Sequence, residues 1–249
     1  MKQSMNVLLT LEYDGTNYNG WQSQNNARAI QDIVDGALAE LHGGSSTPCI
    51  GCSRTDAGVH ALGYKCNFHT GLSIPADRFP FALNPLLPDD IKVINSEEVP
   101  EDFHARYNAK SKTYIYKFYY RQVESPLLRT RAWNVKSEPD IELMKKAAVL
   151  LTGTHDFSSF MAAGGYPSTT VRTIFNSEIE GPNEGIFTFK VRGDGFLYNM
   201  VRIMAGTIFY AGTGKISPDD IPEIISAKDR KKAGITAPAH GLYLFDVEY

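Results

Sequence analysis

The stretch Gly51-Cys52-Ser53-Arg54-Thr55-Asp56-Ala57-Gly58-Val59-His60-Ala61 places a single acid among small residues at the end of an apolar, strand-like segment. Short runs of this kind are usually turns. Here the acid, Asp56, is flanked by Arg54 and His60, and the glycines at positions 51 and 58 let another backbone or a ligand approach closely. A turn that faces only solvent does not need such surroundings, so we expect the chain to be organised around this acid.

Length and composition are those of a globular protein. The chain has 249 residues, of which 43% are hydrophobic, enough for one large domain or two of about 100 to 150 residues. The apolar run after the N-terminal Met1-Lys2-Gln3-Ser4-Met5 is too short for a signal peptide or a membrane span. Three cysteines are an odd number that argues against a disulfide framework and fits a reducing compartment. We expect a cytoplasmic protein.

Positive charge is concentrated in one part of the chain. The formal net charge of −3 gives no global preference for nucleic acid, so a polyanion site has to be a local patch. Residues 106–131 contain seven Lys and Arg residues and the single acid Glu124, a net of +6, whereas residues 89–102 contain six acids and one lysine. The basic segment is either such a patch or a solvated strand with alternating lysines.

Hydrophobic periodicity predicts two cycles of strands and helices. The first cycle has strands over 7–13, 47–53, 62–68 and 91–94 and helices over 30–41 and 75–83. The second has strands over 113–120, 170–179, 185–192 and 242–249, helices over 138–151 and 196–210, and a helix capped by Ser217-Pro218-Asp219-Asp220.

The repeated order predicts an α+β fold. We expect two pseudo-equivalent halves, each ferredoxin-like (the RRM-like arrangement), that share one mostly antiparallel sheet with an active-site cleft between them. Residues 1–106 form the N-terminal half with the Asp56 loop, and residues 107–249 form the C-terminal half with the aromatic basic strand and the Arg202 helix.

The helix predicted over 196–210 is apolar on all sides and carries one guanidinium, that of Arg202. Such a helix is buried, and a buried arginine needs an anionic partner because an isolated charge costs several kcal/mol. The partner could be any acid in a structural ion pair, or the tip of Arg202 could reach the surface. The sharper hypothesis is that Asp56 is the partner and is thereby held ionised.

The strand over 112–120 alternates so that one face carries Lys112, Tyr114, Tyr116, Phe118 and Tyr120. Aromatic strands usually belong to the core. The interleaved cations also fit a surface on which bases stack beside bound phosphates. Both interpretations stay open at the level of sequence.

Cysteine and histidine spacing offers a rival function. Cys49 and Cys52, followed by Cys66 and His69, have the paired spacing of a zinc ribbon. Residues three apart on a strand point to opposite faces, which argues against a shared metal. The chain has no Walker-type phosphate loop and no dinucleotide fingerprint. The alternatives are a non-catalytic RNA-binding module, with or without a stabilising zinc ion, and a hydrolase that uses Asp56 and His60.

Several motifs occur in one order along nearly the whole chain: Tyr13-Asp14-Gly15-Thr16-Asn17-Tyr18 with Gly20-Trp21-Gln22, Arg54-Thr55-Asp56-Ala57-Gly58-Val59-His60-Ala61, Phe103-His104-Ala105-Arg106, Lys112-Thr113-Tyr114, His155-Asp156-Phe157-Ser158-Ser159-Phe160, Met200-Val201-Arg202 and Gly241-Leu242-Tyr243-Leu244. Together they resemble the signatures of the TruA-type tRNA pseudouridine synthases. Where that family usually has glycine before the arginine, this chain has Ser53, a change between small residues.

The resemblance implies the isomerisation of uridine to pseudouridine at positions 38 to 40 in the anticodon arm of tRNA, by a homodimer that needs no metal or cofactor. It also implies roles for individual residues. Asp56 matches the catalytic aspartate, Tyr114 the tyrosine that stacks on the target uracil, Arg202 the basic partner of the aspartate, Leu242 the apolar residue beside the base, and Arg54 the arginine that holds the flipped-out geometry. The RNA-contacting segments match Phe103, His104, Ala105, Arg106 and Tyr107, and the loop Gly164-Gly165-Tyr166-Pro167-Ser168.

The implied chemistry agrees with the residues. The N1–C1′ bond must break, the base must turn, and C5 must bond to C1′ before the C5 proton leaves. One ionised carboxylate can serve as nucleophile or base in this sequence, whether it attacks the base, attacks C1′ or removes a sugar proton. A target base inside RNA must be flipped out, and an aromatic ring compensates the lost stacking.

Overall fold

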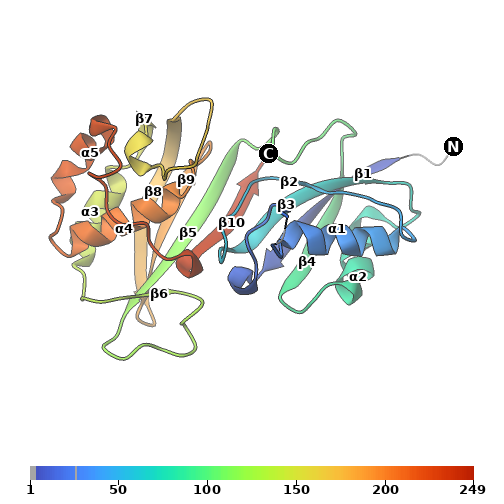
Figure 1. Cartoon of the computed structure of the whole chain (residues 1–249), viewed down its shortest axis with the longest axis horizontal. Coiled ribbons are helices and arrows are strands. Elements are labelled where there is room, and N and C mark those ends of the chain that lie inside the picture. The colour runs from blue at the N-terminus through green and yellow to red at the C-terminus, as the bar shows by residue number, and fades with distance from the viewer. Residues whose placement is uncertain (1–3, 26) are drawn as a thin grey trace. The chain divides into compact units, whose positions relative to one another are not determined.

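The computed structural model describes residues 4–25 and 27–249. Residues 1–3, which begin the N-terminal run discussed above, lie outside the described residues. The chain forms two compact units (Figure 1). The first contains the described residues up to Lys110 together with Leu244–Tyr249, and the second contains Ser111–Tyr243.

The strands of the first unit follow one another in the order β4-β1-β3-β10, and the last of them begins with two residues of the second unit. These strands are β1 (Met5–Tyr13), β3 (His60–Thr70), β4 (Ile91–Val99) and β10 (Leu242–Glu248), and the short β2 (Ile50–Gly51) pairs with β3. The β1/β3, β1/β4 and β2/β3 pairs are antiparallel. Two helices, α1 (Ile30–Leu41) and α2 (Phe79–Leu83), pack against β3, where the Phe68 ring contacts both Phe79 and His42, the residue that follows α1.

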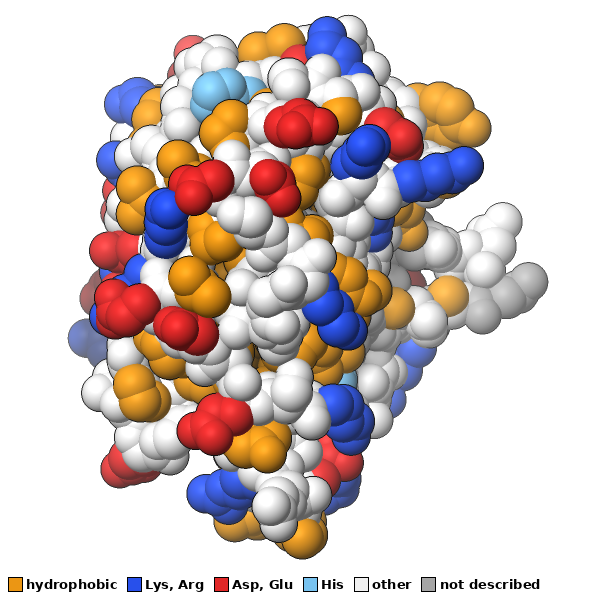
Figure 2. All heavy atoms as spheres, turned by 90° about the vertical axis from the view of Figure 1, so that its left-hand side faces the viewer, with side chains coloured by type: hydrophobic (Ala, Val, Ile, Leu, Met, Phe, Trp, Pro, Cys, Tyr) orange, Lys and Arg blue, Asp and Glu red, His pale blue; other side chains and the backbone are white. Residues whose placement is uncertain are grey.

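Three helices accompany the sheet of the second unit, whose strand order is β5-β9-β8-β7. The strands are β5 (Ser111–Tyr120), β7 (Gly153–Asp156), β8 (Val171–Asn183) and β9 (Ile186–Gly193), with β6 (Trp133–Val135) parallel to β5. The helices are α3 (Ile141–Val149), α4 (Met200–Gly212) and α5 (Ile221–Ala227). Acidic, basic and hydrophobic side chains are interspersed on the face of the molecule in Figure 2.

The predicted α+β class with mostly antiparallel strands is confirmed, and so are most elements. The capping prediction is also confirmed: Ser217 and Asp220 form a capping box directly before α5. The ferredoxin-like form of each half stays a prediction. Among the described residues, none of the helices has the length and apolar character that crossing a membrane requires.

Several predicted boundaries are wrong for identifiable reasons. The strand expected over 47–53 is reduced to β2, since the Cys49 N–H bonds to the Asp35 carboxylate instead of a neighbouring strand. Helix α4 begins at Met200 and not at 196, because Asn199 has a left-handed φ of 59° that a helix interior does not allow. Helix α3 begins after Asp140, whose side chain accepts the N–H groups of the first turn. Strands β6 and β7 were not predicted.

The aromatic strand β5 is core. Tyr116 and Phe118 are fully buried, and Tyr119 on the opposite face is 1% exposed. Phe118 stacks on Phe187 of β9 with ring centroids 5.5 Å apart, and it also contacts Trp133. The interpretation of this strand as a base-stacking platform is therefore wrong for the buried rings at its centre.

Candidate active site

Asp56 opens a tight turn between β2 and β3. Its carbonyl accepts the Val59 N–H at 3.2 Å, and Gly58, the third residue of the turn, has a φ of +77°. This is the geometry of a type II turn, which needs glycine at that position because other residues are strained at positive φ. The turn therefore fixes the backbone from which the half-buried Asp56 side chain extends.

A second segment, the loop that follows β1, holds this turn in place. The carbonyl of Tyr18 accepts the Gly58 N–H at 3.1 Å, and Trp21 donates its N–H to the Thr55 carbonyl at 3.4 Å. Gly20 makes this approach possible, since a Cβ atom there would lie 2.1 Å from the Thr55 carbonyl oxygen. The residues on both sides of Asp56 are thus tied to one loop.

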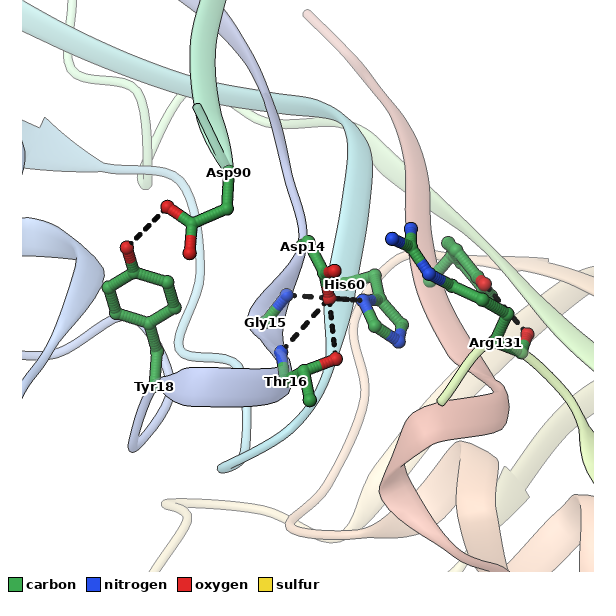
Figure 3. A network of polar contacts seen from close by, with 8 residues as sticks. Asp14, Gly15, Thr16, Tyr18, His60, Asp90 and Arg131 are labelled. Atoms are coloured by element: carbon green, nitrogen blue, oxygen red, sulfur yellow. Dashed lines mark hydrogen bonds and ion pairs between the residues drawn. The ribbon is translucent and has the colours of Figure 1, made fainter. Parts of the chain in front are cut away.

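The polar network in Figure 3 fixes the far end of the turn. The Asp14 carboxylate accepts hydrogen bonds from the N–H and hydroxyl of Thr16 at 3.1 and 2.6 Å, and lies 3.0 Å from Nδ1 of buried His60. The Gly15 N–H also lies 3.1 Å from that nitrogen. These two contacts are alternatives: Nδ1 donates to Asp14 when it carries a proton and accepts from Gly15 when it does not. Either way, His60 is anchored to the loop after β1.

Tyr18 anchors the same loop on its other side. Its hydroxyl donates to the Asp90 carboxylate at 2.6 Å (Figure 3). Burial, together with this hydrogen bond and the charge of Asp90, raises the pKa of Tyr18 to about 12. The hydroxyl therefore stays protonated and remains a donor at neutral pH.

The other predicted site residues of the first unit lie in an exposed turn and beside it. Arg54, Arg106 and Tyr107 are exposed, whereas Ala105 is fully buried. The Ala105 N–H donates to Asn67 at 2.8 Å, and its carbonyl accepts from the Tyr249 hydroxyl at 2.8 Å. Ala105 thus holds the turn, which presents its neighbours to solvent.

In the second unit, Tyr114 and the predicted RNA-binding loop flank the same segment. The Tyr114 ring is 6% exposed and meets Phe196 edge to face, with centroids 5.1 Å apart. Two residues further on, Tyr198 accepts the Ala162 N–H at 3.1 Å and packs near Gly165. Tyr166, in the middle of the loop 164–168, is 96% exposed.

One backbone segment, 237–241, is bonded to Arg202 at its first residue and leads directly into Leu242. Arg202 donates through Nε to the Ala237 carbonyl at 2.8 Å and through a terminal nitrogen to Asn199 Oδ1 at 2.7 Å. Pro238 accepts the Tyr116 hydroxyl at 2.8 Å, and Leu242, 5% exposed, follows this segment directly. Segment 237–241 thereby positions both residues over β5.

The predicted residues therefore fall into two groups. Asp56, Arg54 and 103–107 lie in the first unit, and Tyr114, Arg202, Leu242 and 164–168 lie in the second. The pairing of Asp56 with Arg202 joins the two units and stays a prediction. The sequence does not predict the contacts of Asp14, Tyr18 and Trp21 around the Asp56 turn. Its only indication is that these residues belong to the motif at positions 13–22.

A family model described as tRNA pseudouridine synthase matches residues 10–108 and 147–249. The chain belongs to the tRNA pseudouridine synthase family. It is an isomerase of that family and acts on tRNA. This membership displaces the interpretations of the chain as a hydrolase and as a non-catalytic RNA-binding module.

Curated relatives match the tRNA pseudouridine synthase along nearly its whole length. It is 52% identical over 244 residues to tRNA pseudouridine synthase A of Acetivibrio thermocellus, which covers 98% of this chain and 99% of the relative. The protein of the same name from Ruminiclostridium cellulolyticum is 50% identical, with 98% and 99% covered. A solved chain of a Cbf5-Nop10-Gar1 complex aligns with a TM-score of 0.34 and 9% identity over 81% of this chain and 53% of its own, which is too distant for any argument.

The three cysteines of the synthase are buried and form no disulfide bond. A hydrogen bond with Cys66, together with burial, raises the pKa of the Cys49 thiol well above its usual range. Over residues 4–25 and 27–249, no three His, Cys, Asp or Glu side chains are grouped so that they could hold a metal ion. The zinc site that the spacing allows is therefore not formed by the described residues.

Proposed function

We propose that this tRNA pseudouridine synthase isomerises uridine at positions 38 to 40 in the anticodon arm, with Asp56 as its catalytic residue. The observation that carries the proposal is the construction of the Asp56 turn, which requires Gly58 and is held by two backbone hydrogen bonds, one that the Tyr18 carbonyl accepts and one that the Trp21 N–H donates. A rigid scaffold around one acid is what precise placement of a reacting group needs. The tRNA position rests on the resemblance of the sequence motifs, and the relatives named tRNA pseudouridine synthase A support it.

Arg202 keeps Asp56 ionised in this proposal. From the buried helix α4, Arg202 donates to the Ala237 and Asn199 oxygens. A guanidinium on an otherwise buried helix is stabilised further by a carboxylate, and the carboxylate in turn keeps a low pKa beside it. An ionised Asp56 can then act as nucleophile or base while the glycosidic bond breaks and the C5–C1′ bond forms.

Tyr114 and Leu242 enclose the flipped-out uracil in the same proposal. Tyr114 is held edge to face against Phe196, so its ring is preorganised for stacking. Stacking of an RNA base on such a ring offsets the stacking lost when the base leaves the helix. Arg54 stabilises the flipped-out RNA, and the segments 103–107 and 164–168 contact its backbone. We further expect a cytoplasmic homodimer.

The test is to map pseudouridines in unmodified tRNA after incubation with wild type and with Asp56→Asn, which keeps the shape of the side chain and removes its charge. We expect the variant to lose about 10⁴-fold or more in kcat, as the loss of a catalytic nucleophile or base does, while it still binds tRNA. Asp102→Asn, an exposed acid of the same unit, is the matched control and keeps wild-type activity. Turnover by Asp56→Asn within tenfold of wild type would show that Asp56 is not the catalytic residue. Modification only outside positions 38 to 40 would show that the proposed target position is wrong.

A further inference from the structure

A recess opens beside the Asp56 turn in the first unit. Its cavity of about 250 Å³ is formed by four separate segments: the loop after β1, the start of α1, the residues around β2, and the turn after β4. This volume is smaller than the roughly 300–1,000 Å³ of pockets for drug-sized ligands. It suits a single flat ring system. Arg54, two residues before Asp56, and Trp21, bonded to Thr55, both line it.

One wall of the recess is an aromatic pair, in which Tyr107 is exposed and His104 is half-buried. The His104 and Tyr107 rings lie 4.2 Å apart with planes 31° from parallel, and Tyr107 is 78% exposed. The guanidinium of Arg106 lies 5.9 Å from the centre of the Tyr107 ring. The wall therefore offers a stacking face next to a positive charge, which is the combination that binds bases of single-stranded RNA.

Hydrogen bonds from backbone N–H groups to side-chain acceptors hold this wall without burying Tyr107. Both the Arg106 and Tyr107 N–H groups donate to His104 Nδ1, at 3.2 and 3.3 Å, and the His104 N–H donates to Asn108 Oδ1 at 2.7 Å. Because Nδ1 accepts, the proton of the neutral ring is on Nε2, which is thus a donor. With Ala105 fixed in the core beneath it, the turn is preorganised for a ligand and not merely stabilised by packing.

Another part of the recess carries amide groups that are hydrogen-bonded to one another and to the backbone. Gln22 donates to Gln31 Oε1 at 3.1 Å, the Ser23 N–H donates to the same oxygen at 3.3 Å, and Gln31 donates to the Cys49 carbonyl at 3.3 Å. An exposed glutamine amide supplies both donors and an acceptor, which is what the edge of a base requires. Among the described residues that line the recess, two are arginines and none is acidic, so an anionic ligand is favoured.

We propose that this recess binds one unpaired nucleotide of the RNA other than the uridine that is isomerised. Its base stacks on the His104–Tyr107 wall, its edge meets the Gln22 amide, and its phosphate lies by Arg54 and Arg106. The inference rests on the proposed function for its RNA, the tRNA anticodon arm. A second anchored nucleotide next to the Asp56 turn fixes the register of the loop and thereby decides which uridine reaches the catalytic acid.

The experiment measures binding of a synthetic anticodon-arm RNA to Asp56→Asn protein, so that the RNA is not converted. Tyr107→Ala raises Kd about tenfold, as loss of one base stack does, and Tyr107→Phe restores Kd to within twofold. Arg106→Ala lowers the slope of log Kd against log salt concentration by about 0.7 to 1, the value for one phosphate contact. The matched control is a second exposed cation–aromatic pair that lies outside the recess: Phe81 on α2 and Arg78 in the turn before it. Phe81→Ala leaves Kd unchanged, and Arg78→Ala leaves the salt slope unchanged.

A second readout identifies the bound nucleotide. The fluorescent base 2-aminopurine is placed at each unpaired loop position in turn, and binding quenches it at one position that wild type does not isomerise; Tyr107→Ala removes that quenching. The inference is overturned if Tyr107→Ala leaves Kd and quenching unchanged, or if the quenched position is the isomerised uridine. An arm that is bound with a Tyr107-dependent quench but never isomerised by wild type contradicts the proposed function and supports the recess.

Discussion

At the scale of single residues, the Asp56 turn depends on Gly58. Its φ of +77° costs an alanine about 1–2 kcal/mol, and the turn relieves this strain by moving the residues it connects. Asp56 is the first of them, and a shift of about 1 Å in a reacting group can cost 10²-fold in rate. We expect Gly58→Ala to lower kcat for tRNA by at least about tenfold, measured under saturating RNA.

Gly44 is the matched control for that prediction. It also has a positive φ, +92°, but it lies after α1, and a Cβ atom added there would have no other atom within 4 Å. Gly44→Ala therefore introduces similar strain and a similar loss of stability of about 1–2 kcal/mol with little effect on kcat. Equal kcat values for the two variants would mean that the geometry of the Asp56 turn does not matter for turnover.

Single residues also show which features of the site the sequence can predict and which it cannot. Asp56 could be singled out because its signal is local: one acid, an arginine, a histidine and two glycines within eleven residues. The contacts of Asp14 with His60 and of Tyr18 with Asp90 join residues 46 and 72 positions apart. No periodicity or turn signal encodes such pairs, since they arise only when separate strands are brought into register.

At the scale of elements, helix α4 was predicted as a buried helix and is one, but what it packs against was not predictable. Gly206 lets it approach residues 234–237 so closely that a Cβ atom would lie 1.9 Å from the Ile235 carbonyl oxygen. That approach also aligns Arg202 with the Ala237 carbonyl. Helix propensity alone favours alanine at position 206, but the close packing against residues 234–237 requires glycine.

Two substitutions of the same kind should therefore have opposite signs. Gly206→Ala overpacks α4 and lowers the free energy of unfolding by about 1–3 kcal/mol. Gly36→Ala in α1 meets no atom within 4 Å and raises that free energy by about 0.5–1 kcal/mol, because alanine loses less backbone entropy in a helix. Denaturant unfolding of both variants measures these differences. A stabilised Gly206→Ala variant would show that the contact with residues 234–237 is looser than described.

At the scale of the whole molecule, the chain leaves the first unit at Lys110 and returns to it at Leu244. The returning strand is firmly held there: Lys110 donates to the Glu248 carbonyl at 2.9 Å, and the Tyr249 ring packs on Phe103 with centroids 4.8 Å apart. The order of helices and strands could suggest two halves, but not that the last six residues complete the first one. This follows from pairing between residues far apart in the sequence.

Removing residues 246–249 should therefore destabilise the first unit. The chain has two tryptophans, Trp21 buried in the first unit and Trp133 in the second, so a Trp133→Phe background leaves one reporter of the first unit. We expect the truncation to lower the Trp21 fluorescence melting temperature by about 5–10 °C, the effect of losing one to two kcal/mol in a unit of this size. Tyr249→Phe, which removes only the hydroxyl bound by the Ala105 carbonyl, should lower it less. Because that bond supports the turn 103–107, the truncated protein should also bind anticodon-arm RNA more weakly. An unchanged Trp21 transition would mean that the returning strand does not contribute to the stability of the first unit.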